Sequence, residues 1–92
     1  MNPASATIKI SGRVQGVGFR YFCYRRGAAC GLAGWVRNDP DGAVSILVEG
    51  DRADIEKYLE ELKAGPPAAV VADVDVNWRE FSGQHSSFEI LM

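Results

Sequence analysis

Apolar and polar residues alternate in several stretches of this chain, and that pattern predicts strands. Ile8 and Ile10 alternate with polar neighbours over residues 7–13, and every second residue is apolar over residues 70–78. Side chains of a strand point alternately to its two faces, so each segment offers one face to a core. Residues 33–38 and 43–49 flank the turn-forming sequence Asp-Pro-Asp-Gly, which predicts a hairpin. A short closing strand is expected over residues 88–90.

Two other segments have the spacing of helices. In residues 20–31, Cys23, Gly27 and Cys30 fall on one face, and Gly31 is suited to end the helix. A second helix is expected from Asp51, a residue type that caps helix N-termini, to about Gly65. Its apolar stripe consists of Ile55, Tyr58, Leu59 and Leu62.

The order of these elements is strand, helix, strand, strand, helix, strand and a short final strand. Two strand-helix-strand units joined through a hairpin predict an α+β, ferredoxin-like βαββαβ sandwich. Its antiparallel sheet would be covered on one face by two helices. The 92 residues suit a single domain over 1–92, with residues 1–5 as a flexible N-terminus.

Composition points to a protein of the cytoplasm. The chain is 47% hydrophobic, yet no run approaches the roughly 18 apolar residues of a membrane span, and the start lacks a leader pattern. Cys23 and Cys30 lie too far apart along one helix for a disulfide between them. We therefore expect no membrane association and a cytoplasmic location.

Charge is distributed unevenly along the chain. Six basic and two acidic residues precede Ala43 and give +4, whereas four basic and ten acidic residues follow and give −6. A small anion would be attracted to the first part. A long polyanion would also meet the acidic part, and no aromatic surface for stacking bases is visible, so we expect no nucleic-acid partner.

The segment Val14-Gln15-Gly16-Val17-Gly18-Phe19-Arg20 joins the first strand to the first helix. Two glycines let a backbone turn with its N–H groups converging on one point, and a helix N-terminus adds partial positive charge there. Arg20 would add a planar fork for phosphate oxygens. A plain glycine turn remains an alternative for this segment alone.

A second segment, Gly34-Trp35-Val36-Arg37-Asn38, ends a strand just before a turn, followed by Gly42-x-Val44 and Gly50. Asn38 taken alone could simply begin the turn. Read together, the run from Ile10 to Arg20 resembles the first signature of the acylphosphatases, and the run from Gly34 to Gly50 resembles the second. The resemblance extends over essentially the whole chain, including Gly65-Pro66-Pro67.

The resemblance implies hydrolysis of the carboxyl-phosphate bond of acyl phosphates to a carboxylate and inorganic phosphate, without metal or cofactor. The phosphate-binding loop would consist of Gln15, Gly16, Val17, Gly18, Phe19 and Arg20. Arg20 and the backbone N–H groups would hold the phosphoryl oxygens, and Asn38 would position the attacking water. We expect a monomer with Arg20 and Asn38 as its catalytic residues.

Two alternatives to this enzyme stay open: a non-catalytic module of the same fold that binds a small anion or a partner, and a carbamoyl-phosphate-handling domain. Other reactive residues have simpler interpretations. His85 lies in a polar segment far from both motifs, and Asp39 and Asp41 suit a turn better than a magnesium site.

Gly27 and Cys30 depart from the family pattern, in which Ala and a larger aliphatic residue are usual. Glycine inside a helix costs roughly 0.5 to 1 kcal/mol relative to alanine. Gly27→Ala is therefore expected to stabilise the protein, unless the helix packs too closely on the sheet for a methyl group.

Overall fold

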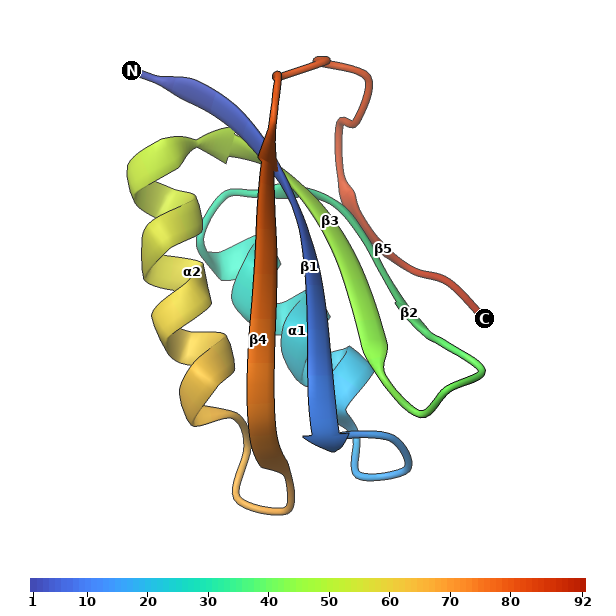
Figure 1. Ribbon diagram of the computed structural model, residues 1–92. Helices are drawn as coiled ribbons and strands as arrows, with labels where there is room; N and C mark the ends of the chain where they lie inside the picture. The colour runs from blue at the N-terminus through green and yellow to red at the C-terminus, as the bar shows by residue number, and fades with distance from the viewer.

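The alternation near the N-terminus forms strand β1 (Pro3–Arg13), which pairs along both edges in the computed structural model of residues 1–92. It runs antiparallel to β3 (Val44–Asp51) on one side and to β4 (Val70–Arg79) on the other. Strand β2 (Ala33–Asn38) pairs with β3, and β5 (Phe88–Ile90) pairs with β2. The sheet therefore has the order β4-β1-β3-β2-β5 (Figure 1).

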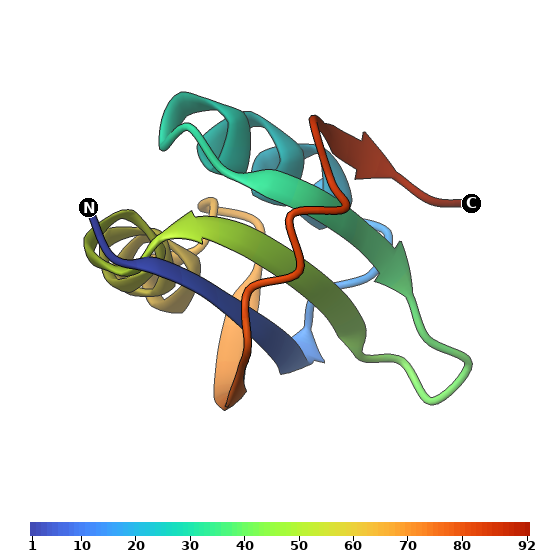
Figure 2. The same ribbon diagram turned by 90° about the horizontal axis from the view of Figure 1, so that it is seen from above.

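Two helices, α1 (Phe19–Ala29) and α2 (Arg52–Ala64), lie together on one face of this sheet (Figures 1 and 2). The observed element order confirms the predicted ferredoxin-like arrangement. Neither helix has the length and apolar character that crossing a membrane would require.

The core lies between the helices and the sheet. It contains 17 buried residues drawn from both layers, of which Tyr58 and Phe19 are the largest that are fully enclosed. The Tyr58 hydroxyl donates a hydrogen bond of 2.8 Å to the carbonyl oxygen of Cys23. Burial of this polar group between the helices is thereby compensated.

The first and last strands differ from the prediction. Strand β1 begins at Pro3 rather than at residue 7, and Pro3, Ala4 and Ser5 pair with β3, although residues 1–5 were expected to be flexible. Strand β5 runs parallel to β2, so the sheet is mixed and only its other four strands are antiparallel. Helix α1 ends at Ala29, with Gly31 in the left-handed conformation just beyond it.

A bulge in β4 changes which of its residues face the core. The register with β1 shifts between Ser11, opposite Asp73, and Gly12, opposite Val71, so Ala72 is the extra residue. Val71 packs against the core, whereas Val70 is 61% exposed. The predicted alternation is therefore correct for Val74 and Val76 but wrong before the bulge.

Asp51 occupies the N-cap position of α2 without the expected capping hydrogen bond. Its Oδ1 accepts a hydrogen bond of 2.9 Å from the backbone N–H of Asn2. The carboxylate thus ties down the N-terminus of the chain, and Asp54 supplies the negative charge in the first turn of the helix.

Glu49 on β3 holds the loop that leads to β5. Glu49 is only 4% exposed. Its carboxylate accepts hydrogen bonds from the backbone N–H groups of Ser82 and Gly83 and from the Ser82 hydroxyl, at 2.8 to 3.0 Å. Burial alone would raise the pKa of Glu49, but these donors outweigh it and lower the pKa below its ordinary value.

Candidate functional site

The loop between β1 and α1 is shaped by two glycines. Gly16 and Gly18 both have φ of +75°, a left-handed conformation that other residues seldom adopt, and open space surrounds the position of an added Cβ at each. Gly18 is the N-cap of α1. The glycines are therefore needed here for backbone conformation and not for close packing.

This loop presents unused hydrogen-bond donors. No backbone N–H group from Gln15 to Tyr21 donates to an acceptor in the protein, and the first turn of α1 contains no acidic residue. Free N–H groups at a helix N-terminus form a site of partial positive charge that suits an anion. The predicted phosphate-binding loop of residues 15–20, the cradle, is thus present as a set of unpaired donors.

Arg20 lies one residue inside α1 and extends toward β2 and β5. Its Nη1 donates a hydrogen bond of 3.0 Å to the carbonyl oxygen of Leu91, just after β5. No acidic side chain pairs with this guanidinium. The contact with Leu91 fixes the side chain, and its other N–H groups remain for a ligand.

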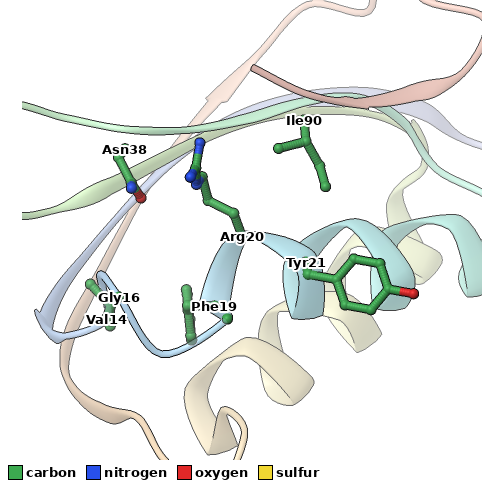
Figure 3. A pocket seen from close by; sticks show the side chains of 8 residues that line it. Val14, Gly16, Phe19, Arg20, Tyr21, Asn38 and Ile90 are labelled. Atoms are coloured by element: carbon green, nitrogen blue, oxygen red, sulfur yellow. The ribbon is translucent and has the colours of Figure 1, made fainter. Parts of the chain in front are cut away.

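Asn38 is the last residue of β2 and lies opposite Val44 on β3. Its Oδ1 atom is buried and is the one such side-chain oxygen or nitrogen in the protein without a hydrogen-bond partner. A buried acceptor without a partner costs free energy, so its retention points to a partner that binds there. Figure 3 shows the Asn38 amide turned toward the same space as the Arg20 guanidinium.

These groups surround one cavity of about 220 Å³ at the end of the sheet where β1 and β2 both terminate (Figures 1 and 3). Most of the predicted site residues meet there, and two do not: the side chains of Gln15 and Val17 lie outside, with Val17 against the core. The lining consists of Val14, Gly16, Gly18, Phe19, Arg20, Tyr21, Asn38 and Ile90.

The Gln15 side chain links the cradle to the turn that follows Asn38. Its Nε2 donates to the carbonyl oxygens of Asp39 and Ala43, at 2.8 and 2.9 Å. One amide thus fixes the separation between the phosphate-binding loop and the β2–β3 turn. This function of the Gln15 side chain was not predicted from the sequence, which indicated only a role for the backbone N–H of this residue.

The remaining candidate groups have structural partners elsewhere. Asp39 accepts from Ser45 and Arg37, and Asp41 accepts from Lys9 at 2.7 Å and from the N–H of Ala43. No three His, Cys, Asp or Glu side chains are grouped so that they could hold a metal ion. His85, in the loop between β4 and β5, does not line the cavity.

Neither cysteine is poised for nucleophilic chemistry. Burial raises the pKa of Cys23 to about 12. Burial, followed by the hydrogen bond to Glu61, raises the pKa of Cys30 to about 11. Both groups are therefore neutral thiols near pH 7, and both are free of disulfides.

Val14, Tyr21 and Ile90 line the cavity but were not predicted, and neither was the contact from Leu91. Val14 and Tyr21 flank the predicted loop, so their proximity could have been expected. Ile90 and Leu91 enter because β5 pairs in parallel with β2 and places Ile90 opposite Val36. A three-residue strand carries no local signal of its pairing partner.

The chain is similar in sequence and in fold to several known proteins. A model of the acylphosphatase family matches residues 6–90. The acylphosphatase of Acaryochloris marina is 51% identical over 82 residues, which are 89% of this chain and 87% of that protein. That of Syntrophotalea carbinolica is 43% identical over 90 residues, 98% of each chain. The crystal structure of acylphosphatase from Bacillus subtilis superimposes with a TM-score of 0.93 at 39% identity, covering 97% of this chain and 99% of that one.

Proposed function

Because this chain belongs to the acylphosphatase family and hydrolyses acyl phosphates, we propose that the cavity at the end of β2 is its active site. Arg20 and the loop of residues 15–20 bind the phosphoryl group, and Asn38 positions the water. The observation that carries this proposal is the meeting of free N–H donors, a guanidinium and a buried unpaired amide oxygen in one cavity.

Phosphate capture uses two kinds of donor. The unpaired N–H groups at the start of α1 point their partial positive charge at the equatorial phosphoryl oxygens, and Arg20 adds a full charge from the side of β5. Negative charge spreads over these oxygens as the reaction proceeds, so fixed donors bind the transition state better than the substrate.

Asn38 acts on the other reactant. Its Oδ1 accepts a hydrogen bond from the attacking water and orients the oxygen lone pair toward phosphorus. An amide takes up no proton near pH 7, so the role is positioning rather than base catalysis. Occupation by water also supplies the hydrogen bond that this buried oxygen lacks in the protein.

The chemical step requires few groups. The water oxygen forms a bond to phosphorus while the bond from phosphorus to the acyl oxygen breaks, and the carboxylate leaves with that electron pair. One water proton passes to the phosphate product or to solvent. A carboxylate is a stable leaving group, so no strong general acid is needed, in keeping with a cavity lined by one charged residue.

Steady-state release of inorganic phosphate from benzoyl phosphate, with a chelator present, tests this assignment. Arg20→Ala is expected to lower kcat/KM by more than about a hundredfold. Arg20→Lys keeps the positive charge without the planar fork, and its kcat/KM is expected to lie between those of Arg20→Ala and the wild type. Activity of Arg20→Ala close to the wild-type value would remove this residue from the site.

We also propose that the protein acts as a monomer in the cytoplasm, releasing inorganic phosphate there. The phosphate-binding donors and Asn38 of a single copy already meet in one cavity, so the proposed mechanism requires no residue from a second copy. The two cysteines are free thiols, a state typical of reducing compartments.

A further inference from the structure

In-line displacement assigns a direction to the acyl group within the proposed active site. The attacking and leaving oxygens lie on opposite sides of phosphorus. Water held by Asn38 attacks from one end of the cavity, so the acyl group leaves toward the other end. Figure 3 shows Tyr21 at the end opposite Asn38. The acyl chain is therefore directed along the outer side of α1.

A second cavity begins where the first one ends. It has a volume of about 360 Å³ and shares Gly18 and Tyr21 with the proposed active site. Tyr21 is 58% exposed, so its ring offers an apolar surface at the junction. The remaining lining residues are Phe22, Arg25, Arg26 and Pro66.

The two arginines of this second cavity differ in their partners. Arg26 forms an ion pair with Glu61 on α2. Arg25 has no acidic partner, and its guanidinium lies 5.7 Å from the centre of the Tyr21 ring. Neither cavity is lined by an acidic residue. Arg25 is thus the unneutralised cation on the path of the acyl group.

We propose that the second cavity binds the acyl group and that Arg25 favours acyl phosphates whose acyl group ends in a second anionic group, such as the monoacyl phosphate of a dicarboxylic acid. This inference rests on the proposed function of the first cavity. Tyr21 contacts the carbon skeleton, and Arg25 pairs with the distal carboxylate.

The spacing along α1 suits such a substrate. Arg25 follows Arg20 by five positions, which is about 7.5 Å along the helix axis and about 140° around it. Arg25 therefore lies on the side of α1 that carries Tyr21, and the acyl group reaches it by passing along the Tyr21 ring. A short carbon chain or a benzene ring separates the two anionic groups by a similar length. The flexible Arg25 side chain adjusts the remaining distance.

Two substrates of matched shape test the proposal. 4-Carboxybenzoyl phosphate has a distal carboxylate, whereas 4-methylbenzoyl phosphate has a methyl group in its place. The measured quantity is the ratio of their kcat/KM values in the wild-type protein, in Arg25→Gln and in Arg79→Gln. Arg79 also lacks an acidic partner and lies opposite Ser5, at the end of the sheet away from the cradle. Its replacement removes the same charge.

We expect Arg25→Gln to lower the ratio about three- to fivefold, the upper part of the range for one solvent-accessible ion pair, and Arg79→Gln to leave it unchanged. An unchanged ratio in Arg25→Gln would overturn the proposal, and so would an equal fall in Arg79→Gln, which would indicate a general charge effect. Failure of the wild type to hydrolyse 4-methylbenzoyl phosphate would instead contradict the proposed function, because that substrate has no second anionic group.

Discussion

Replacement of Gly27 by alanine has two opposing effects on the free energy of unfolding, one through helix propensity and one through core packing. Gly27 lies in the buried face of α1, and a Cβ atom there would lie 2.5, 2.7 and 3.1 Å from the Cε2, Cδ2 and Cζ atoms of Phe88. Favourable carbon contacts are about 3.5 to 4.0 Å. The Phe88 ring is 7% exposed and packs edge-on against Tyr24 and Tyr58, at 6.3 and 6.2 Å between ring centres. It has little room to move.

The two contributions differ in sign and size. Alanine in place of glycine stabilises a helix by about 0.5 to 1 kcal/mol. An extra carbon in a tightly packed core costs about 1 to 3 kcal/mol. Packing therefore outweighs propensity, and we predict that Gly27→Ala lowers the free energy of unfolding by about 1 kcal/mol. For a protein of this size that corresponds to a fall in Tm of about 4 to 8 °C.

Urea denaturation tests whether contact with the Phe88 ring causes the predicted loss of stability. The four proteins compared are the wild type, Gly27→Ala, Phe88→Leu and the double variant. Leucine at position 88 removes the ring atoms that the new methyl group would meet. In that background Gly27→Ala is expected to stabilise by about 0.5 to 1 kcal/mol, because only helix propensity remains. Stabilisation in the wild-type background, or equal destabilisation in both, would refute the packing argument.

Three further predictions concern groups that position the site. Gln15→Leu removes both bonds to the β2–β3 turn and is expected to lower kcat about tenfold or more by displacing the cradle from Asn38. The same change should have little effect in an Asn38→Ala background, and equal losses in both backgrounds would show that Gln15 acts independently. Glu49→Gln should lower the free energy of unfolding near pH 7 by about 1 to 3 kcal/mol. Folding lowers the pKa of Glu49 from 4.5, so the stability that this carboxylate contributes is present above pH 4.5 and is lost as the pH falls through the folded-state pKa. The unfolding free energies of the wild type and Glu49→Gln should therefore converge in acid, and a constant difference down to pH 2 would contradict this. Deleting residues 91–92 removes the acceptor of Arg20 and should weaken inhibition by inorganic phosphate, measured as Ki, whereas an unchanged Ki would show that Leu91 does not hold the arginine.

Local sequence patterns predicted the bounds of those elements whose ends are determined by residues nearby in the sequence. Strand β2 has the predicted bounds, and α2 ends at the expected Gly65, because a hairpin turn and a helix stop are encoded within a few residues. The cradle loop could also be located, since Gly16 and Gly18 are themselves the residues that its conformation requires.

Long-range pairing could not be predicted in the same way. Whether β5 pairs in parallel with β2 depends on the loop that Glu49 holds, 33 residues before Ser82 in the chain. The bulge at Ala72 depends on how β4 meets β1 and leaves the apolar pattern of β4 unchanged. The Gln15 contact needs the loop and the turn to be placed together. Each of these features arises from tertiary packing and cannot be predicted from the apolar pattern of a single segment.

Water positioning by Asn38 is tested by measuring, in an Asn38 variant, both kcat and the affinity of the protein for inorganic phosphate. Asn38→Ala should lower kcat by about a hundredfold to a thousandfold while the Ki for phosphate stays within about threefold, because the phosphate donors are unchanged. Asn77→Ala, on the exposed part of β4, is the matched control and should alter neither value. A nearly normal kcat in Asn38→Ala, or a parallel loss of phosphate binding, would contradict water positioning by this residue.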